Sequence, residues 1–186
     1  FESLDDLYAI VRRIDFTKYI DRHQSFAIRA QRMGVHPFTS IDVARVTGQA
    51  VIDSFLSSTN HRLKVDLERP DVILRVYVKD EWFAIGIDTT GDDSLHKRGY
   101  RVYQHPAPLK PTIAYSLVRL SEWKDKESFI DPMCGSGTIP IEAARYACNI
   151  PASFLRKRFA FQKLKFIEAE KFDKIKSKYD KLIQKK

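Results

Sequence analysis

The sequence has few of the residues that hold small secreted or metal-stabilised folds together. Its 186 residues include two cysteines, Cys134 and Cys148, and neither forms a metal-binding spacing with the five histidines. A disulfide-linked or zinc-stabilised fold is therefore not expected, and the simplest interpretation is a reduced, cytoplasmic chain that holds no metal. No histidine lies close in sequence to Cys134, which argues against a cysteine nucleophile.

Long apolar stretches are also missing. No run approaches the roughly 18 to 20 apolar residues of a membrane-spanning helix. The first residues lead into an acidic amphipathic segment rather than a signal peptide, and because residue 1 is not Met we interpret the chain as a fragment. The hydrophobic content of 44% is typical of a globular protein, and the length suffices for one large or two small domains.

The excess of positive charge is confined to the end of the chain. Residues 1–155 contain 20 Lys and Arg and 20 Asp and Glu, whereas residues 156–186 contain 12 basic and 4 acidic residues, which accounts for the net charge of +8. Such a stretch is either an ordinary solvated helix face or a basic strip that contacts RNA phosphates. Both interpretations stay open.

The most informative stretch present is DPMCGSGT, residues 131–138. The apolar run Ser128-Phe129-Ile130 before it predicts a buried strand, and IPIEAAR after it predicts the first turns of a helix. Two glycines permit a sharp turn and the close approach of a ligand, and an acid at the carboxyl end of a strand faces the crevice where open α/β sheets bind ligands. The stretch therefore predicts a small-molecule site.

Two common ligand motifs are excluded at this turn. A phosphate-binding P-loop needs a Lys after its last glycine, and a dinucleotide-binding turn needs a third glycine three residues after Gly137. The sequence has neither.

The longer string DPMCGSGTIPIEAA closely resembles the first motif of class I S-adenosylmethionine-dependent RNA methyltransferases that carry a THUMP domain in front. That group includes archaeal tRNA guanine-N2 methyltransferases and bacterial 23S rRNA guanine-N2 methyltransferases. The resemblance implies S-adenosyl-L-methionine as cofactor, bound by Asp131, Pro132, Cys134, Gly135, Ser136, Gly137, Thr138 and Glu142. The alternative is a tight turn with no ligand.

The first half of the chain predicts a small α/β module. Helical spacing covers 4–14 and 39–55, the second opened by a capping box of Thr39 and Asp42. Strands are expected at 25–32 and 64–67 and as a hairpin over 72–78 and 82–87. SFAIRAQR, VDLERPD and ILRVYVKDEWFAIGID resemble the latter part of a THUMP domain, and LHKRGYR resembles the segment that links THUMP to the methyltransferase domain.

The expected fold class is α/β: a THUMP module followed by the start of a Rossmann-like class I methyltransferase domain. The expected parts are residues 1–22 as the end of an N-terminal ferredoxin-like domain, 23–95 as the THUMP RNA-binding domain, 96–108 as a linker, and 109–186 as a truncated methyltransferase domain with an insertion over 149–165.

Candidate RNA-binding residues lie in two segments. Arg29 and Arg32 are expected on the polar side of the first THUMP strand. Lys97, Arg98, Arg101 and Lys110 fall in a stretch with four basic and no acidic residues. Phosphate contacts of this kind position RNA without reading its bases. An ordinary surface charge is the alternative for each. His36 and Trp82 are expected to pack rather than to stack on bases.

The resemblance implies that the protein, a monomer, transfers a methyl group to the N2 of a guanosine in the acceptor region of tRNA. The wording DPM, where bacterial rRNA enzymes are expected to have DPF, favours tRNA. The alternatives are a 23S rRNA guanine-N2 methyltransferase and a THUMP RNA-binding module with an inactive catalytic domain. The family's Asn/Asp-Pro-Pro-Tyr motif, which holds the guanine amine, does not occur in this chain, so no catalytic residue is assigned.

Overall fold

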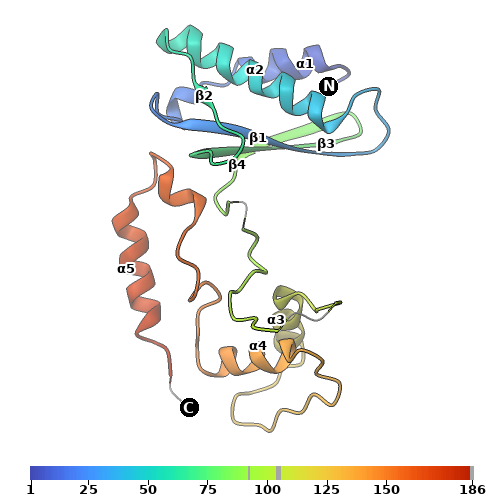
Figure 1. The fold of residues 1–186 in the computed structure, drawn as a ribbon, viewed down its shortest axis with the longest axis vertical. Coiled ribbons are helices and arrows are strands. Elements are labelled where there is room, and N and C mark those ends of the chain that lie inside the picture. Colours follow the sequence, from blue (N-terminus) through green and yellow to red (C-terminus); the bar gives the residue numbers. More distant parts are fainter. Residues whose placement is uncertain (92, 104–105, 185–186) are drawn as a thin grey trace. The chain divides into compact units, whose positions relative to one another are not determined.

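The computed structural model describes residues 1–91, 93–103 and 106–184, and the chain divides into two compact units (Figure 1). The first unit comprises Phe1–Gly91 and Phe159–Glu168, and the second comprises Asp92–Arg158 and Ala169–Lys186. None of the helices in the described ranges combines the length and the apolar character that crossing a membrane requires.

The first unit is a four-stranded sheet with two helices on one of its faces (Figure 1). Its elements are α1 (Leu4–Arg12), the short helix η1 (Phe16–Lys18), β1 (Ser25–Met33), α2 (Ser40–Thr59), β2 (Lys64–Val65), β3 (Val72–Lys79) and β4 (Trp82–Ile87). The strand order is β2-β1-β3-β4; β1 runs parallel to both neighbours, and β3 and β4 form an antiparallel hairpin. The predicted module is therefore confirmed.

Local sequence signals set the bounds of the helices. The predicted capping box at the start of α2 is present: the Thr39 side chain accepts from the amide of Asp42, and the Asp42 side chain accepts from the amide of Thr39. At its other end, Asn60 takes a left-handed conformation that closes the helix. The apolar stripes of α1 and α2 bury side chains such as Val11 and Phe55 against the sheet, which forms the core of this unit.

A segment from late in the chain belongs to the first unit. Residues 159–168, with the short helix η2 (Ala160–Lys163), pack on β3. The amide of Phe161 donates to the carbonyl of Thr89 over 3.0 Å, the Lys163 ammonium lies 2.8 Å from an Asp71 oxygen, and Leu164 is buried in the core. The sequence predicts for this stretch only an insertion in the methyltransferase half.

The second unit contains α3 (Pro111–Leu120), α4 (Thr138–Ala147) and α5 (Ala169–Asp180), of which α3 and α4 pack together. The strand predicted at 128–130 is wrong for this structure: these residues form no strand, and Ile130 is 84% exposed. A strand is stabilised by a neighbour that accepts and donates its backbone hydrogen bonds. The described part of this unit supplies no such neighbour.

Candidate cofactor-binding site

The glycine turn predicted from the sequence forms at the start of α4. Within it, the amide of Gly137 donates to the carbonyl of Cys134 over 2.8 Å. Gly135 (φ +53°) and Gly137 (φ +75°) both have left-handed backbone conformations, and Gly137 is the N-cap of α4. A side chain is strained in that conformation, so the turn depends on glycine at both positions.

A hollow of about 180 Å³ lies beside this turn. Its walls are formed by residues 107–109 and by Asp131, Met133, Cys134, Gly135, Ser136, Thr138 and Ile139. Of the eight residues predicted to bind the cofactor, the structure therefore brings five to one hollow. The other three, Pro132, Gly137 and Glu142, do not line it.

The two carboxylate oxygens of Asp131 have different surroundings. Oδ1 accepts a hydrogen bond from the amide of Met133 over 3.2 Å, whereas Oδ2 is buried and meets no hydrogen-bond partner among the described residues. A buried polar oxygen without a partner is destabilising, so Oδ2 can be satisfied by a ligand that brings an N–H or a positive charge. An added Cβ at Gly135 would meet no described atom within 4 Å, so this side of the turn is open.

The linker before α3 holds the end of the turn in place. The Arg101 guanidinium donates to the Thr138 hydroxyl over 3.2 Å and to the Leu109 carbonyl over 3.0 Å. Leu109 and Thr138 both line the hollow, and Thr138 is buried. Arg101, predicted to contact RNA, thus joins two walls of the candidate cofactor site.

A buried charge cluster lies one turn further along α4. Glu142 is 2% exposed, and its Oε1 lies 3.5 Å from the Nε of Arg98, whose side chain is 9% exposed. Arg145 is also buried and donates to the carbonyl of Pro151 over 2.7 Å. Glu142, Arg98 and Arg145 line a separate hollow of about 340 Å³. The structure therefore places Glu142 in a contact with the linker rather than at the glycine turn.

Burial changes the acidity of this cluster. Burial, together with the neighbouring Glu142 carboxylate, raises the pKa of the Tyr100 hydroxyl well above its ordinary value. Burial also lowers the pKa of Arg145, and the nearby Arg98 adds to that effect while Glu142 opposes it. The Arg145 guanidinium lies 5.5 Å from the centre of the Tyr100 ring. Two arginines, a tyrosine and a glutamate thus form one buried network that ties residues 98–101 to α4.

The remaining basic residues of this segment are exposed. Lys97 pairs with Asp93 over 3.1 Å, and Lys110 is the exposed N-cap of α3. Of the four basic residues predicted to contact RNA between 97 and 110, these two are exposed, Arg101 is partly exposed, and the Arg98 side chain is 9% exposed.

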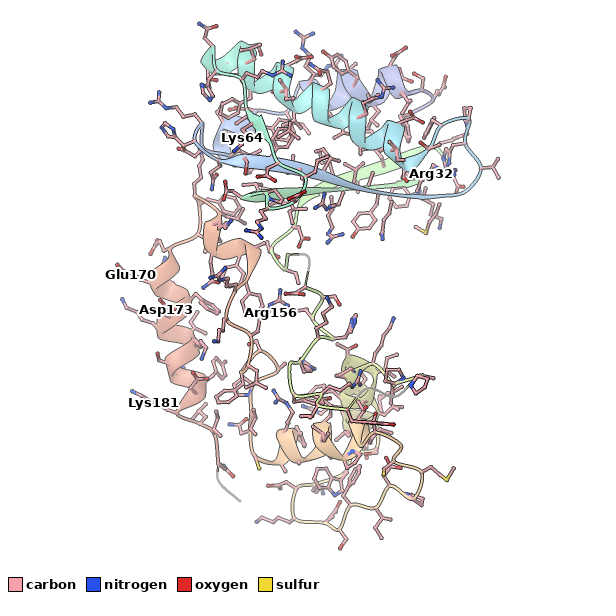
Figure 2. All side chains as sticks on the ribbon, in the orientation of Figure 1. Arg32, Lys64, Arg156, Glu170, Asp173 and Lys181 are labelled. Atoms are coloured by element: carbon pink, nitrogen blue, oxygen red, sulfur yellow. The ribbon has the colours of Figure 1, made fainter. Side chains whose placement is uncertain are left out.

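The predicted placement of Arg29 and Arg32 on one side of β1 is wrong. Strand residues alternate between faces. The register pairs Arg29 with Arg75 and Arg32 with Val78, which lie on opposite faces. Arg32, labelled in Figure 2, donates to the carbonyl of Gly34 over 2.8 Å, and Arg29 donates to the carbonyl of Leu67 over 2.9 Å.

His36 and Trp82 differ in how far they are packed against other side chains. His36 packs beside Phe38, with ring centres 5.0 Å apart, as predicted. Trp82, which was also expected to pack, is 54% exposed at the start of β4. Its exposure follows from its position on the face of the sheet that α1 and α2 do not cover.

The basic end of the chain does not form one continuous element. Lys163 pairs with Asp71 and Lys165 donates to the carbonyl of Thr17, both in the first unit. Along α5, basic residues alternate with Glu170 and Asp173, labelled in Figure 2, and Lys176 pairs with Asp180. These contacts favour a mixed, solvated helix face over a uniform basic strip.

Both cysteines are free thiols, and Cys134 is exposed in the turn. Within residues 1–91, 93–103 and 106–184, no three His, Cys, Asp or Glu side chains gather in a group that could hold a metal ion.

Comparison with known families agrees with the two-part organisation. The THUMP domain profile matches residues 1–88, and the UPF0020 profile, described as an RMKL-like methyltransferase domain, matches residues 98–183. Together they account for almost the whole chain.

The similar proteins are methyltransferases. The chain is 55% identical to the tRNA (guanine(6)-N2)-methyltransferase of Methanocaldococcus jannaschii over 94% of its own length and 46% of the relative's. It is also 55% identical to the enzyme of the same name from Archaeoglobus fulgidus over 88% of its own length and 40% of the relative's. The chain thus spans less than half the length of these curated relatives.

Among solved structures, SMU.472 in complex with SAH matches with a TM-score of 0.86 and 25% identity, over 98% of this chain and 48% of that one. TrmN from Thermus thermophilus matches with a TM-score of 0.60 and 30% identity, over 77% of this chain and 41% of that one. The two profiles, the archaeal relatives and the fold agree: the chain belongs to the THUMP-domain-containing methyltransferases, with a THUMP domain followed by a segment that matches an RMKL-like methyltransferase domain.

Proposed function

We propose that the protein transfers a methyl group from S-adenosyl-L-methionine to the N2 of a guanosine in the acceptor region of tRNA. The observation that carries the cofactor assignment is the glycine turn with its hollow and the unpartnered Oδ2 of Asp131. The tRNA assignment is supported by the names of the two archaeal relatives at 55% identity.

The residues at the turn suit the methionine end of this cofactor. Asp131 would accept from the amino group through its Oδ2, and Gly135 would allow the ligand to approach the backbone closely. The first amides of α4 lack partners within the helix and favour a carboxylate at its N-terminus. When bound, the cofactor supplies a sulfonium-activated methyl group; the protein contributes position and a suitable electrostatic environment.

The other residues predicted to bind the cofactor would act around this centre. We propose that Pro132 and Gly137 shape the turn, and that Glu142 serves it indirectly by fixing α4 to the linker through Arg98. RNA phosphates would be contacted by the exposed cations Lys97 and Lys110 and by Arg29.

The domain boundaries stay a proposal: 1–22 for the end of a ferredoxin-like domain, 23–95 for THUMP, 96–108 for the linker and 109–186 for the methyltransferase part. A cytoplasmic location and a monomeric state likewise stay predictions.

Calorimetric titration of the full-length protein with S-adenosyl-L-methionine tests the cofactor assignment. Saturable one-site binding that disappears in Gly137→Val supports an active methyltransferase. Absence of cofactor binding in the folded, unsubstituted protein would favour the alternative function, that of a THUMP RNA-binding module with an inactive catalytic domain. The other alternative is a 23S rRNA substrate, which is tested by comparing tRNA and 23S rRNA as methyl acceptors.

A further inference from the structure

The chain passes between the two units three times. It leaves the first unit after Gly91, returns to it at Phe159 and leaves it again after Glu168. We refer to residues 159–168 as the strap; in Figure 1 it is the orange segment just before α5. Since Gly91 and Phe159 both belong to the first unit, the chain between them starts and ends on that unit. We refer to this part, residues 92–158, as the loop.

Backbone hydrogen bonds join the two ends of the loop. The amide of Phe161 donates to the carbonyl of Thr89 over 3.0 Å, and the amide of Ala160 donates to the carbonyl of Thr90 over 3.4 Å. A Cβ built at Gly91 would lie 3.5 Å from the Cβ of Ala160, so the two chain segments are in close contact. The loop is therefore closed at its base.

A buried carboxylate fixes the point where the chain leaves the first unit. Asp88 is 8% exposed, and its Oδ1 accepts from the amides of Thr90 and Gly91 over 2.8 and 2.9 Å. Its Oδ2 lies 2.7 Å from the Nε of Arg75 on β3. Hydrogen bonds to a charged group are stronger than those between neutral groups. The base of the loop is thus held on the sheet as well as closed on itself.

Side chains anchor the strap further along. The Lys163 ammonium lies 2.8 Å from Oδ1 of Asp71, whose Oδ2 accepts from the amide and the hydroxyl of Ser25 over 3.0 Å each. The Gln24 amide group donates to the carbonyl of Lys163 over 2.7 Å. Leu164 is 2% exposed and belongs to the core of the first unit. A surface ion pair contributes little by itself, so the buried leucine is the stronger anchor.

The last residues of the strap contact the segment between α1 and β1. Lys165 donates to the carbonyl of Thr17, and the ring of Phe166 lies edge-on to that of Tyr19 with the ring centres 6.1 Å apart. The strap thus contacts the first unit from Ala160 to Phe166.

Domains that are joined by one flexible linker move relative to each other by default. A chain held at both ends has fewer conformations than a chain held at one end. We propose that the strap is a positioning element for methyl transfer, with Lys163 and Leu164 as its positioning residues. By holding both ends of the loop on the first unit, it limits the motion of the glycine turn relative to RNA bound by the THUMP domain. The proposal rests on the proposed function.

Lys163 and Leu164 act through position rather than through contact with the cofactor. Neither residue lines the hollow at the glycine turn. Methyl transfer requires the methyl group and the accepting nitrogen in line, and a displacement of about 1 Å can lower a rate by roughly 100-fold. Release of the strap should therefore slow the chemical step and leave the binding of each substrate unchanged.

The test measures single-turnover methylation of tRNA by the full-length protein with cofactor and RNA both saturating. We expect Leu164→Ala and Lys163→Glu each to lower the rate by roughly 10- to 100-fold. The dissociation constants for cofactor and tRNA, measured by calorimetry, stay as in the unsubstituted protein. Lys163→Arg retains the rate because a guanidinium still pairs with Asp71, and Leu164→Met retains it because the volume is conserved. Lys163→Glu keeps the core intact and so tests the strap even if Leu164→Ala does not fold.

The matched control is Lys157→Glu. Lys157 is exposed and lies in the second unit just before the strap, so this variant reverses the same charge outside it. We expect the rate of the unsubstituted protein. Amide hydrogen exchange gives a readout that needs no activity: exchange at Phe161 is faster in the two strap variants and unchanged in Lys157→Glu.

Two results would overturn the positioning role. One is an unchanged rate in a folded double variant, Lys163→Glu with Leu164→Ala. The other is a loss of tRNA affinity as large as the loss of rate, since the strap would then only support RNA binding by the first unit. The proposed function fails separately: it is wrong if the unsubstituted protein methylates no RNA, whereas an active protein whose strap variants are equally active refutes the strap alone.

Discussion

Removing Arg98 from its buried pair with Glu142 should lower the free energy of unfolding, and the geometry of the pair sets the size of that loss. Arg98→Ala leaves a carboxylate that is 2% exposed without the cation 3.5 Å from it. At an effective dielectric constant near 20, a pair at this distance interacts by about 5 kcal/mol. Removing one partner of a buried pair typically costs about 3–5 kcal/mol, because the other charge stays buried. We expect a loss of about that size in the free energy of unfolding.

Urea unfolding of the full-length protein measures the effect, and two variants serve as controls. Lys97→Ala removes the neighbouring exposed cation and its surface pair with Asp93, so it costs less than about 1 kcal/mol. The double variant Arg98→Met, Glu142→Met removes both charges, and we expect it to recover most of the stability lost in Arg98→Ala. Equal stabilities of Arg98→Ala and Lys97→Ala would refute the buried pair and return Arg98 to the candidates for RNA binding.

Further predictions concern the turn, its anchor and the buried tyrosine. Gly135→Val and Gly137→Val place branched side chains on left-handed residues, at a cost of about 1–2 kcal/mol each, and abolish cofactor binding in calorimetry. Arg101→Ala removes the side chain that joins Thr138 to Leu109, so we expect it to raise the KM for the cofactor and to leave the KM for RNA unchanged. A KM for the cofactor equal to that of the unsubstituted protein would contradict this. The folded-state pKa of Tyr100 lies above its unfolded value of 10.0, so its contribution to stability is present below pH 10 and is lost as pH rises further. Tyr100→Phe should remove this part of the alkaline pH dependence in unfolding measurements.

Much of the first unit could be predicted from the sequence because its signals are local. The capping box of Thr39 and Asp42, the alternation in β1 and the hairpin of β3 and β4 each depend on residues within one segment. The glycine turn was predicted for the same reason, since left-handed positions favour glycine wherever they occur.

The errors concern contacts between distant segments. Arg98 and Arg101 are basic in a basic stretch, and nothing near them in sequence shows that Glu142 and Thr138 bind them. The strand at 128–130 needs a neighbour, and apolar character alone does not supply one. Trp82 is exposed because the helices cover only the other face of the sheet, which depends on the topology. Arg29 and Arg32 lie on opposite faces of β1 because a three-residue spacing along a strand changes face, and this alternation can be deduced from the sequence.

Transfer of a labelled methyl group tests the central claim most directly. The full-length protein is incubated with labelled S-adenosyl-L-methionine and, separately, with intact tRNA, tRNA lacking its 3′ CCA end and ribosomal RNA, and the products are digested to nucleosides. We predict N2-methylguanosine in the acceptor region of intact tRNA, with slower methylation of the truncated tRNA. Equal rates on the two tRNAs would contradict docking of the unpaired end, and label in ribosomal RNA alone would contradict the assignment to tRNA.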